Sequence, residues 1–322
     1  MVNPISNFYK TRGAGELLVE KINEAFISLR KGHVIIPLID DEAQKLLQEQ
    51  FVSNGSTLTP FVVSNNNFYY QQNFRKEVEI VDWVYNKVFQ KDESCIKYAK
   101  TDKFKSLIDL LFPNVGEVDW QKIGSVNCFV NQFSILSGGP GTGKTTTVAK
   151  FLSLLLSYNL NLNKIALVAQ TAKASTRLKE SLNNQLASLK KLNIDQRIID
   201  ILEEVIPSTI HRLLKTNPGS LGAQFMYSSA NYLPHDVVLI DEASMIDLNF
   251  MHKLFLAIKP SAKVVLMGDK NQLSPVGAGS VFSDITQAMY ENIFPESMHF
   301  LCDLGLPEKH IRNGEFNVMV QL

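Results

Sequence analysis

The stretch FSILSGGPGTGKTTTVAK, Phe133–Lys150, decides the fold. It begins with a short apolar run and passes into the glycine-rich segment Gly138–Thr145, which fits the phosphate-loop pattern GxxxxGK(S/T). The residues from Lys144 onward open a helix. A strand, a glycine-rich turn and a helix in this order are typical of nucleotide-binding α/β domains. The stretch therefore predicts such a domain with a site for a nucleoside triphosphate.

The residue types of this loop have a physical reason. Glycines let the backbone curl so that successive N–H groups face one anion, and the start of the helix adds its positive dipole end. Lys144 is expected to reach the β- and γ-phosphates, while the hydroxyl of Thr145 holds Mg²⁺. The predicted phosphate-binding residues are Gly138, Gly139, Pro140, Gly141, Thr142, Gly143, Lys144, Thr145 and Thr146.

Three further apolar runs follow the phosphate loop, at Lys164–Gln170, Asp236–Ser244 and Ala262–Asp269. Helical patterns lie between them, and continuously apolar strands that alternate with helices indicate a parallel sheet covered on both faces. Each run ends in a polar or glycine-rich loop. Because ligands of open α/β sheets bind beyond the carboxyl ends of the strands, we expect the site in these loops.

Two acids end the run Val237–Glu242. Asp241 is placed to hold Mg²⁺ opposite Thr145, and Glu242 can orient and polarise the attacking water as a general base. The alternative is a pair of acids that cap the helix after the strand. With a phosphate loop in the same chain, the sequence favours the catalytic interpretation.

Two glutamines complete the predicted site. Gln272 can sense a γ-phosphate or its attacking water, or it can be a solvated loop residue. Asp269 is expected near it. Gln121 precedes the phosphate-loop strand, and its amide could pair with the edge of adenine. The predicted catalytic residues are Lys144, Asp241, Glu242 and Gln272, and the predicted metal ligands are Thr145 and Asp241.

Residues 1–115 read as a separate, smaller and mainly helical domain, joined at Phe112–Trp120 to a second domain over 116–322. Gly15–Gly32 has the three- and four-residue apolar spacing of an amphipathic helix. Phe61–Gln72 has two strand-like runs across asparagine-rich turn residues, which predicts a hairpin. This part of the chain has no catalytic constellation.

Composition gives few further constraints. Lysine plus arginine equals aspartate plus glutamate at 32 each, so the net charge names no partner. Cys95, Cys128 and Cys302 form no CxxC pair and are expected to be inert thiols in a reducing cytoplasm. We expect a cytoplasmic protein without signal peptide or membrane span. Basic residues recur from Lys164 to Arg197, either along a nucleic-acid backbone or on a solvated helical face.

The order of these motifs resembles the superfamily 1 DNA helicases. Within them it is closest to the RecD family, the alpha subunits of exodeoxyribonuclease V (the RecBCD complex). The resemblance is dense over 120–285 and fainter before it. The segments that carry it are DWQKIG (119–124), SGGPGTGKTTTVAK (137–150), QTAKASTRLKESL (170–182), STIHRLL (208–214), LIDEASMIDL (239–248) and GDKNQLSPVGAGSVFSDI (268–285).

The resemblance implies a RecA-like phosphate-loop NTPase domain after the helical one, with ATP and Mg²⁺ as cofactors. Gln121 would recognise adenine, and Gln272 would couple the nucleotide to DNA. Thr171 and Thr209–His211 would line the path of single-stranded DNA. The family moves 5′ to 3′ within a complex that unwinds duplex ends in double-strand break repair and recombination. Its partners are RecB and RecC, and its first domain docks on RecC.

The chain departs from the family pattern in two places. Gln170–Lys173 stands where the family has Pro-Thr-Gly-Lys, and Phe294–Leu322 has no counterpart of the second RecA-like domain, which supplies an arginine to the γ-phosphate. We therefore expect a helicase chain truncated after its first motor domain. The alternative is a nucleotide-binding and partner-docking remnant without motor activity.

Overall fold

The computed structural model describes residues 3–90, 92–113, 117–159, 161, 164–192, 194–216, 225–272, 275–313 and 318–322. Contacts divide the chain into two compact units. The first contains the residues up to Asp82 together with Met245–His252 and 275–281, and the second contains the others. The chain thus enters the first unit again after Ser244 and after Gln272.

The first unit consists of helices around a small mixed sheet in the order β1-β4-β3-β2. Helices and strands up to the division are α1 (Pro4–Lys10), α2 (Glu16–Arg30), β1 (Ile35–Pro37), α3 (Asp40–Leu46), β2 (Val52–Ser53), β3 (Phe61–Ser64), β4 (Asn67–Tyr70) and the first part of α4 (Gln71–Phe89). The predicted hairpin is confirmed. β3 and β4 pair antiparallel across Asn65 and Asn66, both left-handed at φ 48° and 54°, as a two-residue turn of twisted strands requires.

Two returning segments pack inside the first unit. The Gly279 N–H donates to the Gly32 carbonyl at 2.9 Å, and the Leu248 N–H donates to the Ala278 carbonyl at 3.2 Å. Gly279 has φ +86°, and a Cβ there would lie 2.7 Å from Cβ of Leu248. This turn therefore requires glycine at position 279.

The second unit is built on a six-stranded sheet in the order β12-β5-β9-β8-β6-β7, in which every neighbouring pair is parallel. The α/β prediction is confirmed. The strands are β5 (Phe133–Ser137), β6 (Ile165–Ala169), β7 (Ser208–Thr209), β8 (Val237–Ile240), β9 (Lys263–Gly268) and β12 (Met319–Gln321). Four of them are the predicted apolar runs. β7 and β12 are too short and mixed in sequence to have been predicted.

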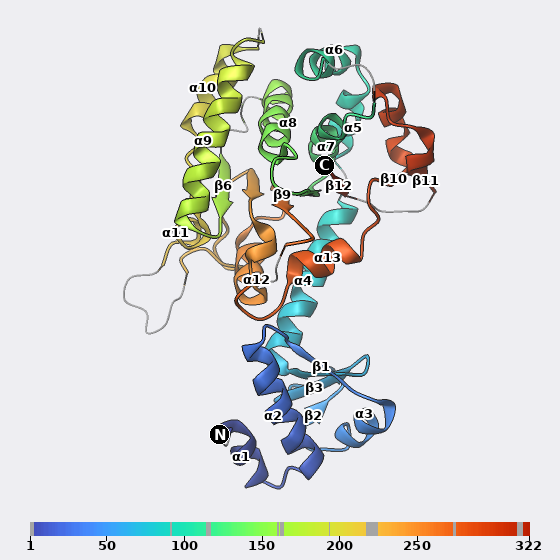
Figure 1. The fold of residues 1–322 in the computed structure, drawn as a ribbon, viewed down its shortest axis with the longest axis vertical. Helices are drawn as coiled ribbons and strands as arrows, with labels where there is room; N and C mark the ends of the chain where they lie inside the picture. The colour runs from blue at the N-terminus through green and yellow to red at the C-terminus, as the bar shows by residue number, and fades with distance from the viewer. Residues whose placement is uncertain are drawn as a thin grey trace. The chain divides into compact units, whose positions relative to one another are not determined.

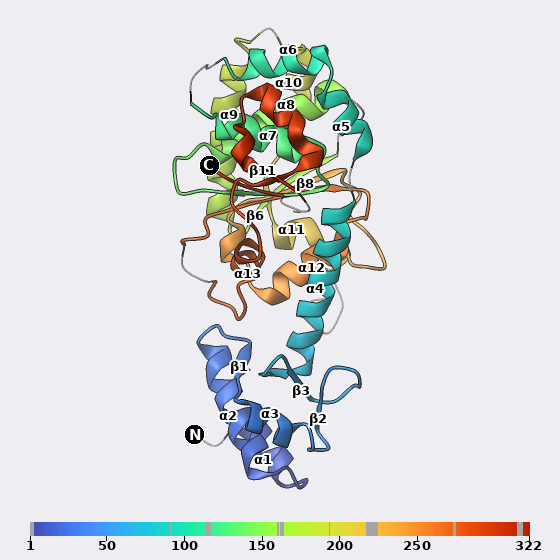
Figure 2. The ribbon, with the colours of Figure 1, turned by 90° about the vertical axis from the view of Figure 1, so that its right-hand side faces the viewer.

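Helices cover the sheet. α7, α8 and α9 lie beside one another on one face (Figures 1 and 2), where Phe129, Phe151 and Leu182 are fully buried in one core. The helices of this unit are α5 (Glu93–Ala99), α6 (Asp102–Leu111), α7 (Trp120–Val130), α8 (Lys144–Tyr158), α9 (Ala172–Leu189), α10 (Gln196–Glu204) and α11 (Ile210–Leu214). It also contains α12 (Leu248–Ala257) from Lys253 onward and α13 (Val281–Gln287) from Phe282 onward. The short remaining elements are the 3₁₀ helices Ala243–Met245, Glu296–Leu304 and Glu308–His310 and the paired strands β10 (Phe294–Pro295) and β11 (Ile311–Arg312).

The contact division differs from the domain boundary expected near residue 115. α5 and α6 place Cys95, Phe104 and Ile108 in the same core as Phe129, so residues 93–111 pack with the second unit. The division falls inside α4, between Asp82 and Trp83. Sequence periodicity shows which face of a helix is apolar, but it does not show which core that face joins.

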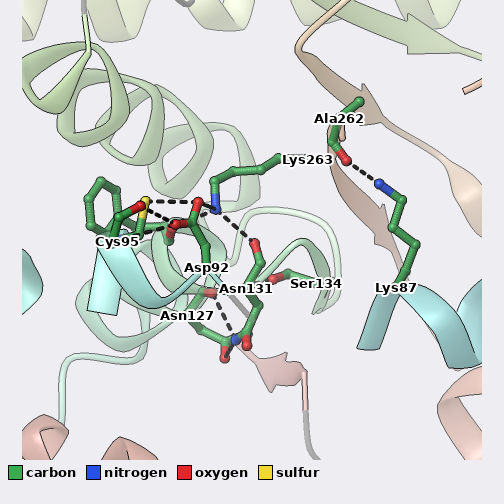
Figure 3. Close-up of polar contacts among 10 residues, drawn as sticks. Lys87, Asp92, Cys95, Asn127, Asn131, Ser134, Ala262 and Lys263 are labelled. Carbon is green, nitrogen blue, oxygen red and sulfur yellow. Dashed lines mark hydrogen bonds and ion pairs between the residues drawn. The ribbon is translucent and has the colours of Figure 1, made fainter. Parts of the chain in front are cut away.

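A buried polar cluster ties α5 and α7 to the sheet (Figure 3). The ammonium of Lys263, at the start of β9, donates to the carbonyls of Phe129 at 2.9 Å and Asn131 at 3.2 Å and pairs with Asp92 at 3.3 Å. The Cys95 thiol donates to Asp92 at 3.2 Å. Lys263 thus satisfies carbonyls at the end of α7, where the helix itself offers no partner.

Burial raises the pKa of the Cys95 and Cys128 thiols to about 12, so both stay protonated and unreactive at neutral pH. Among the described residues, no helix combines the length and apolar character needed to cross a membrane.

Candidate nucleotide-binding site

A pocket of about 550 Å³ lies at the carboxyl ends of β5, β8 and β9, where the predicted site residues converge. Its lining residues are Gly139, Pro140, Gly141, Gly143, Lys144, Thr145, Thr146, Arg177, Ser181, Asp241, Glu242, Gly268, Asp269 and Gln272. The parallel register of the three strands brings their following loops to one edge. This is why residues more than a hundred positions apart line one cavity.

The phosphate loop leaves β5 as predicted. The Gly138 N–H donates to the Gly268 carbonyl at 3.0 Å, which joins the loop to the end of β9. α8 begins at Lys144, and its N-cap, Gly143, offers no side chain to the first helical N–H groups. Free N–H groups at the start of a helix, open to a pocket, suit an anion.

Gln121 lies against the outside of this loop. Its amide nitrogen donates to the Thr142 carbonyl at 3.2 Å, and a Cβ at Gly143 would lie only 2.2 Å from that nitrogen. Gly143 is also left-handed, at φ +90°. In this structure, therefore, Gln121 supports the phosphate loop from behind, and it is not among the residues that line the pocket.

Lys144 folds back over the loop. Its ammonium donates to the Gly139 carbonyl at 2.9 Å and closely to that of Gly138. Burial lowers the pKa of Lys144, and the charges of Asp241 and Asp269 oppose this effect. The ammonium is thus held at the pocket by two backbone carbonyls, and the charges of Asp241 and Asp269 favour its protonated form.

Asp241 and Glu242 follow β8 directly. The Asp241 N–H donates to the Val168 carbonyl at 2.8 Å, and its carboxylate accepts from the Glu242 N–H at 2.9 Å. Burial raises the pKa of Asp241, and burial together with the charge of Asp241 raises the pKa of Glu242. Glu242 has φ 53°, a conformation costing a non-glycine residue about 1–3 kcal/mol, which is typical of functional sites.

Gln272 is held by both neighbouring loops. Its amide oxygen accepts from the Ser244 hydroxyl at 3.1 Å, and its N–H donates to the Asp269 carbonyl at 3.1 Å. Asp269, only 8% exposed, accepts from the Asn271 N–H at 2.9 Å. The residue after β9 therefore shapes the loop that carries Gln272.

The donor set suits Mg²⁺. Thr145 offers a hydroxyl, and Asp241 offers a half-buried carboxylate whose pKa is raised by desolvation and lowered in part by the charge of Lys144. Over the described residues, no cluster of three or more His, Cys, Asp or Glu could hold a metal by itself. Mg²⁺ commonly takes one or two protein ligands and completes its shell with phosphate oxygens and water.

Arg177 and Ser181 also line the pocket and were not predicted as site residues. They are four positions apart on α9 and so share one face of the helix. The charge of Arg177 opposes the rise in the pKa of Glu242. The sequence signal for these two residues was their position on the helix that follows Thr171. The basic residues of that helix are equally typical of a solvated face, so the signal was not decisive.

The predicted DNA-facing residues have local structural roles. Thr171 caps α9 by accepting from the Ala174 N–H at 3.1 Å, and Thr209 caps α11 by accepting from the Arg212 N–H at 3.3 Å. Thr209 ends β7 and Thr171 lies two positions after β6, so both lie at the carboxyl ends of neighbouring parallel strands, the same edge of the sheet as the pocket loops.

Much of the basic stretch 164–197 is used locally. Lys179 donates to the carbonyls of Glu203 and Val205, Lys190 pairs with the Glu203 carboxylate at 2.6 Å, and Arg197 pairs with Asp195 at 2.6 Å. For these three residues the contacts favour a helical face stabilised by neighbours.

Known proteins resemble this chain in the same region. A family model described as an AAA domain matches residues 121–278. The RecD subunit of the RecBCD enzyme from Haemophilus influenzae is 34% identical over 247 residues, which cover 76% of this chain and 38% of that protein. The corresponding subunit from Mycolicibacterium smegmatis is 41% identical over 194 residues, 56% of this chain and 33% of that protein.

A protein of Deinococcus radiodurans named as the ATP-dependent RecD2 DNA helicase is 34% identical over 154 residues, covering 48% of this chain and 18% of its own length. The chain spans well under half the length of these curated relatives. The AAA-domain match over residues 121–278 includes the phosphate loop, both acids and the Gln272 loop, and the matches to RecD subunits extend over most of the chain. The chain therefore belongs to the RecD family.

Proposed function

We propose that this chain binds ATP with Mg²⁺ in the pocket at the ends of β5, β8 and β9 and hydrolyses it for 5′ to 3′ movement on DNA. The observation that carries the proposal is the convergence of Lys144, Asp241, Glu242 and Gln272 on one cavity of about 550 Å³. The names of the relatives support it, because they include RecD subunits and an ATP-dependent DNA helicase.

The phosphate loop would bind the triphosphate. The N–H groups at the start of α8 and the Lys144 ammonium would face the β- and γ-phosphates, while Gln121 keeps the loop in shape from behind. We also propose, from the resemblance to the RecD family, that Gln121 recognises adenine. Thr145 and Asp241 would hold Mg²⁺, which neutralises charge on the phosphates.

Hydrolysis would use the residues after β8 and β9. Glu242 would accept a proton from the attacking water, since its carboxylate lines the pocket beside Asp241. Gln272 would contact the γ-phosphate or that water from the opposite loop. Arg177 would add positive charge on the α9 side of the pocket.

The resemblance to RecD subunits supports a wider role. We propose that the chain acts as the alpha-type subunit of an exodeoxyribonuclease V complex in double-strand break repair and recombination, with RecB and RecC as partners. The first unit would dock on RecC, and Thr171 and Thr209–His211 would lie along single-stranded DNA. Phe225 would add an aromatic surface there, since the centre of its ring lies 6.1 Å from that of His211.

A direct test compares nucleotide binding by the 322-residue chain, Lys144→Ala and Lys191→Ala. Lys191 is exposed and is not among the residues that line the pocket, so it is a matched control. A fluorescent ATP analogue with Mg²⁺ should bind the parent and the control alike and bind Lys144→Ala at least tenfold more weakly. Equal binding by all three proteins would refute the site.

ATP hydrolysis measured with and without single-stranded DNA distinguishes a working helicase motor from a nucleotide-binding and partner-docking chain. DNA-stimulated turnover would support a working motor. Nucleotide binding without turnover would instead support a nucleotide-binding and docking chain. Absence of both would reject the proposal.

A further inference from the structure

Ser244 connects the two loops that carry the proposed catalytic residues. It follows Glu242 by two positions, it is 6% exposed, and its hydroxyl donates to the amide oxygen of Gln272 at 3.1 Å. Ser244 itself is not among the residues that line the pocket, whereas Gln272 is. The contact is thus made behind the face that a nucleotide would meet.

In this structure the contact places the amide oxygen of Gln272 against Ser244. A glutamine amide has an accepting oxygen on one side and two N–H donors on the other. A serine hydroxyl can satisfy either side, but here it donates to the oxygen. The amide nitrogen of Gln272 therefore faces away from Ser244, and its N–H groups can donate to another partner.

Backbone hydrogen bonds hold the loop around Gln272 in place. The Gln272 N–H is held by the Asp269 carbonyl, and the preceding N–H of Asn271 is held by the Asp269 carboxylate. Since Asp269 is buried at the end of β9, these bonds fix the loop to the sheet. The Gln272 side chain can still rotate relative to this backbone, and its hydrogen bond from Ser244 restrains that rotation.

We propose that Ser244 is a positioning residue that presents Gln272 to the nucleotide as a hydrogen-bond donor, so that the site recognises the anionic oxygens of a γ-phosphate. The inference rests on the proposed function of the pocket. A donor at this position favours a triphosphate over a diphosphate, because only the triphosphate has a γ-phosphate whose oxygens can accept from it. Ser244 thereby contributes to nucleotide discrimination without touching the ligand.

The test measures binding of Mg²⁺-ADP and of a non-hydrolysable Mg²⁺-ATP analogue by calorimetry. Loss of one hydrogen bond to a charged group corresponds to about tenfold in affinity. Ser244→Ala should weaken the analogue by about threefold to tenfold and leave ADP within about twofold. Ser244→Thr keeps the hydroxyl and should restore the preference. Gln272→Ala should lose the same preference, and adding Ser244→Ala to it should change nothing more.

The outcomes are distinguishable. If Ser244→Ala weakens ADP and the analogue equally, or if its effect adds fully to that of Gln272→Ala, the positioning role is refuted while nucleotide binding stands. The same holds if the parent protein does not distinguish the two nucleotides. If the parent binds neither nucleotide, the proposed function fails and this inference fails with it. Thermal unfolding of each variant shows that the fold is retained.

Discussion

Replacing Lys263 by methionine is expected to destabilise the second unit by about 3 kcal/mol. The side chain is 6% exposed, and its ammonium holds two carbonyls at the end of α7 and the carboxylate of Asp92 (Figure 3). Methionine keeps most of the apolar stem but none of these bonds. Asp92 then remains largely buried without its cation.

The magnitude follows from the groups left without a partner. Breaking a buried ion pair by removing one member costs about 3–5 kcal/mol, because the other charge stays buried. Asp92 keeps its hydrogen bonds from Ser94 and Cys95, and its side chain is 19% exposed. Both reduce the penalty, so the lower end of the range applies. Asp92→Asn should cost less, because it leaves Lys263 with its two carbonyls.

Urea unfolding measures these differences as a change in midpoint at constant slope. The double variant Lys263→Met, Asp92→Asn should be more stable than the sum of the single changes predicts, because the two residues interact. A loss below about 1 kcal/mol for Lys263→Met, or full additivity, would refute the reasoning. It would mean that water replaces the ammonium in this cluster.

The same cluster predicts a dependence on pH. Burial opposes ionisation of Asp92, but hydrogen bonds from Ser94 and Cys95 and the charge of Lys263 outweigh it and lower its pKa to about 2. A carboxyl whose pKa is lowered on folding adds stability above its unfolded pKa near 4 and loses it as pH falls towards 2. After allowance for solvent screening, about 1–2 kcal/mol should disappear over that interval in the parent. Asp92→Asn should lack this component.

Three further results are expected. Gly143→Ala should weaken nucleotide binding at least tenfold in fluorescence titration. A Cβ at this position would lie 2.2 Å from the Gln121 amide nitrogen, and the φ of +90° is strained for alanine. Unchanged affinity would contradict the role of the loop shape. Arg177→Ala should lower ATP turnover more than ADP affinity, and an equal loss in both would mean general electrostatic attraction. Phe255→Ala should cost about 3–5 kcal/mol, followed by tryptophan fluorescence, because its fully buried ring stacks on Trp83 at 4.2 Å; a loss under about 1 kcal/mol would contradict this.

The sequence was most informative where one local pattern has one structural solution. The phosphate loop, the acids after Ile240 and the four long apolar runs predicted both the sheet and the edge at which the pocket lies. The turn at Asn65 and Asn66 was likewise predicted from residue types that tolerate a left-handed backbone. These features depend on neighbours in sequence.

The features that were not predicted depend on packing between distant segments. Arg177 reaches the pocket only because α9 packs beside α8, and Ser244 meets Gln272 only because β8 and β9 are adjacent. The apolar faces of α5 and α6 were visible, but their assignment to the second core was not. The two-residue strand β7 has no apolar period to detect, since it is defined by pairing with β6 alone.

Two segments from the second half of the chain, Met245–His252 and 275–281, belong to the first unit. This limits how the two units can be expressed as separate fragments. A fragment that starts at Trp83 would carry Met245–His252 and 275–281 but not the residues those segments pack with, including the Gly32 carbonyl that holds Gly279. Such a fragment would have loose loops immediately after Ser244 and Gln272. Expression of this part alone should therefore yield a protein in which Met245–His252 and 275–281, next to the proposed catalytic residues, lack their packing partners. Limited proteolysis should cut these segments first.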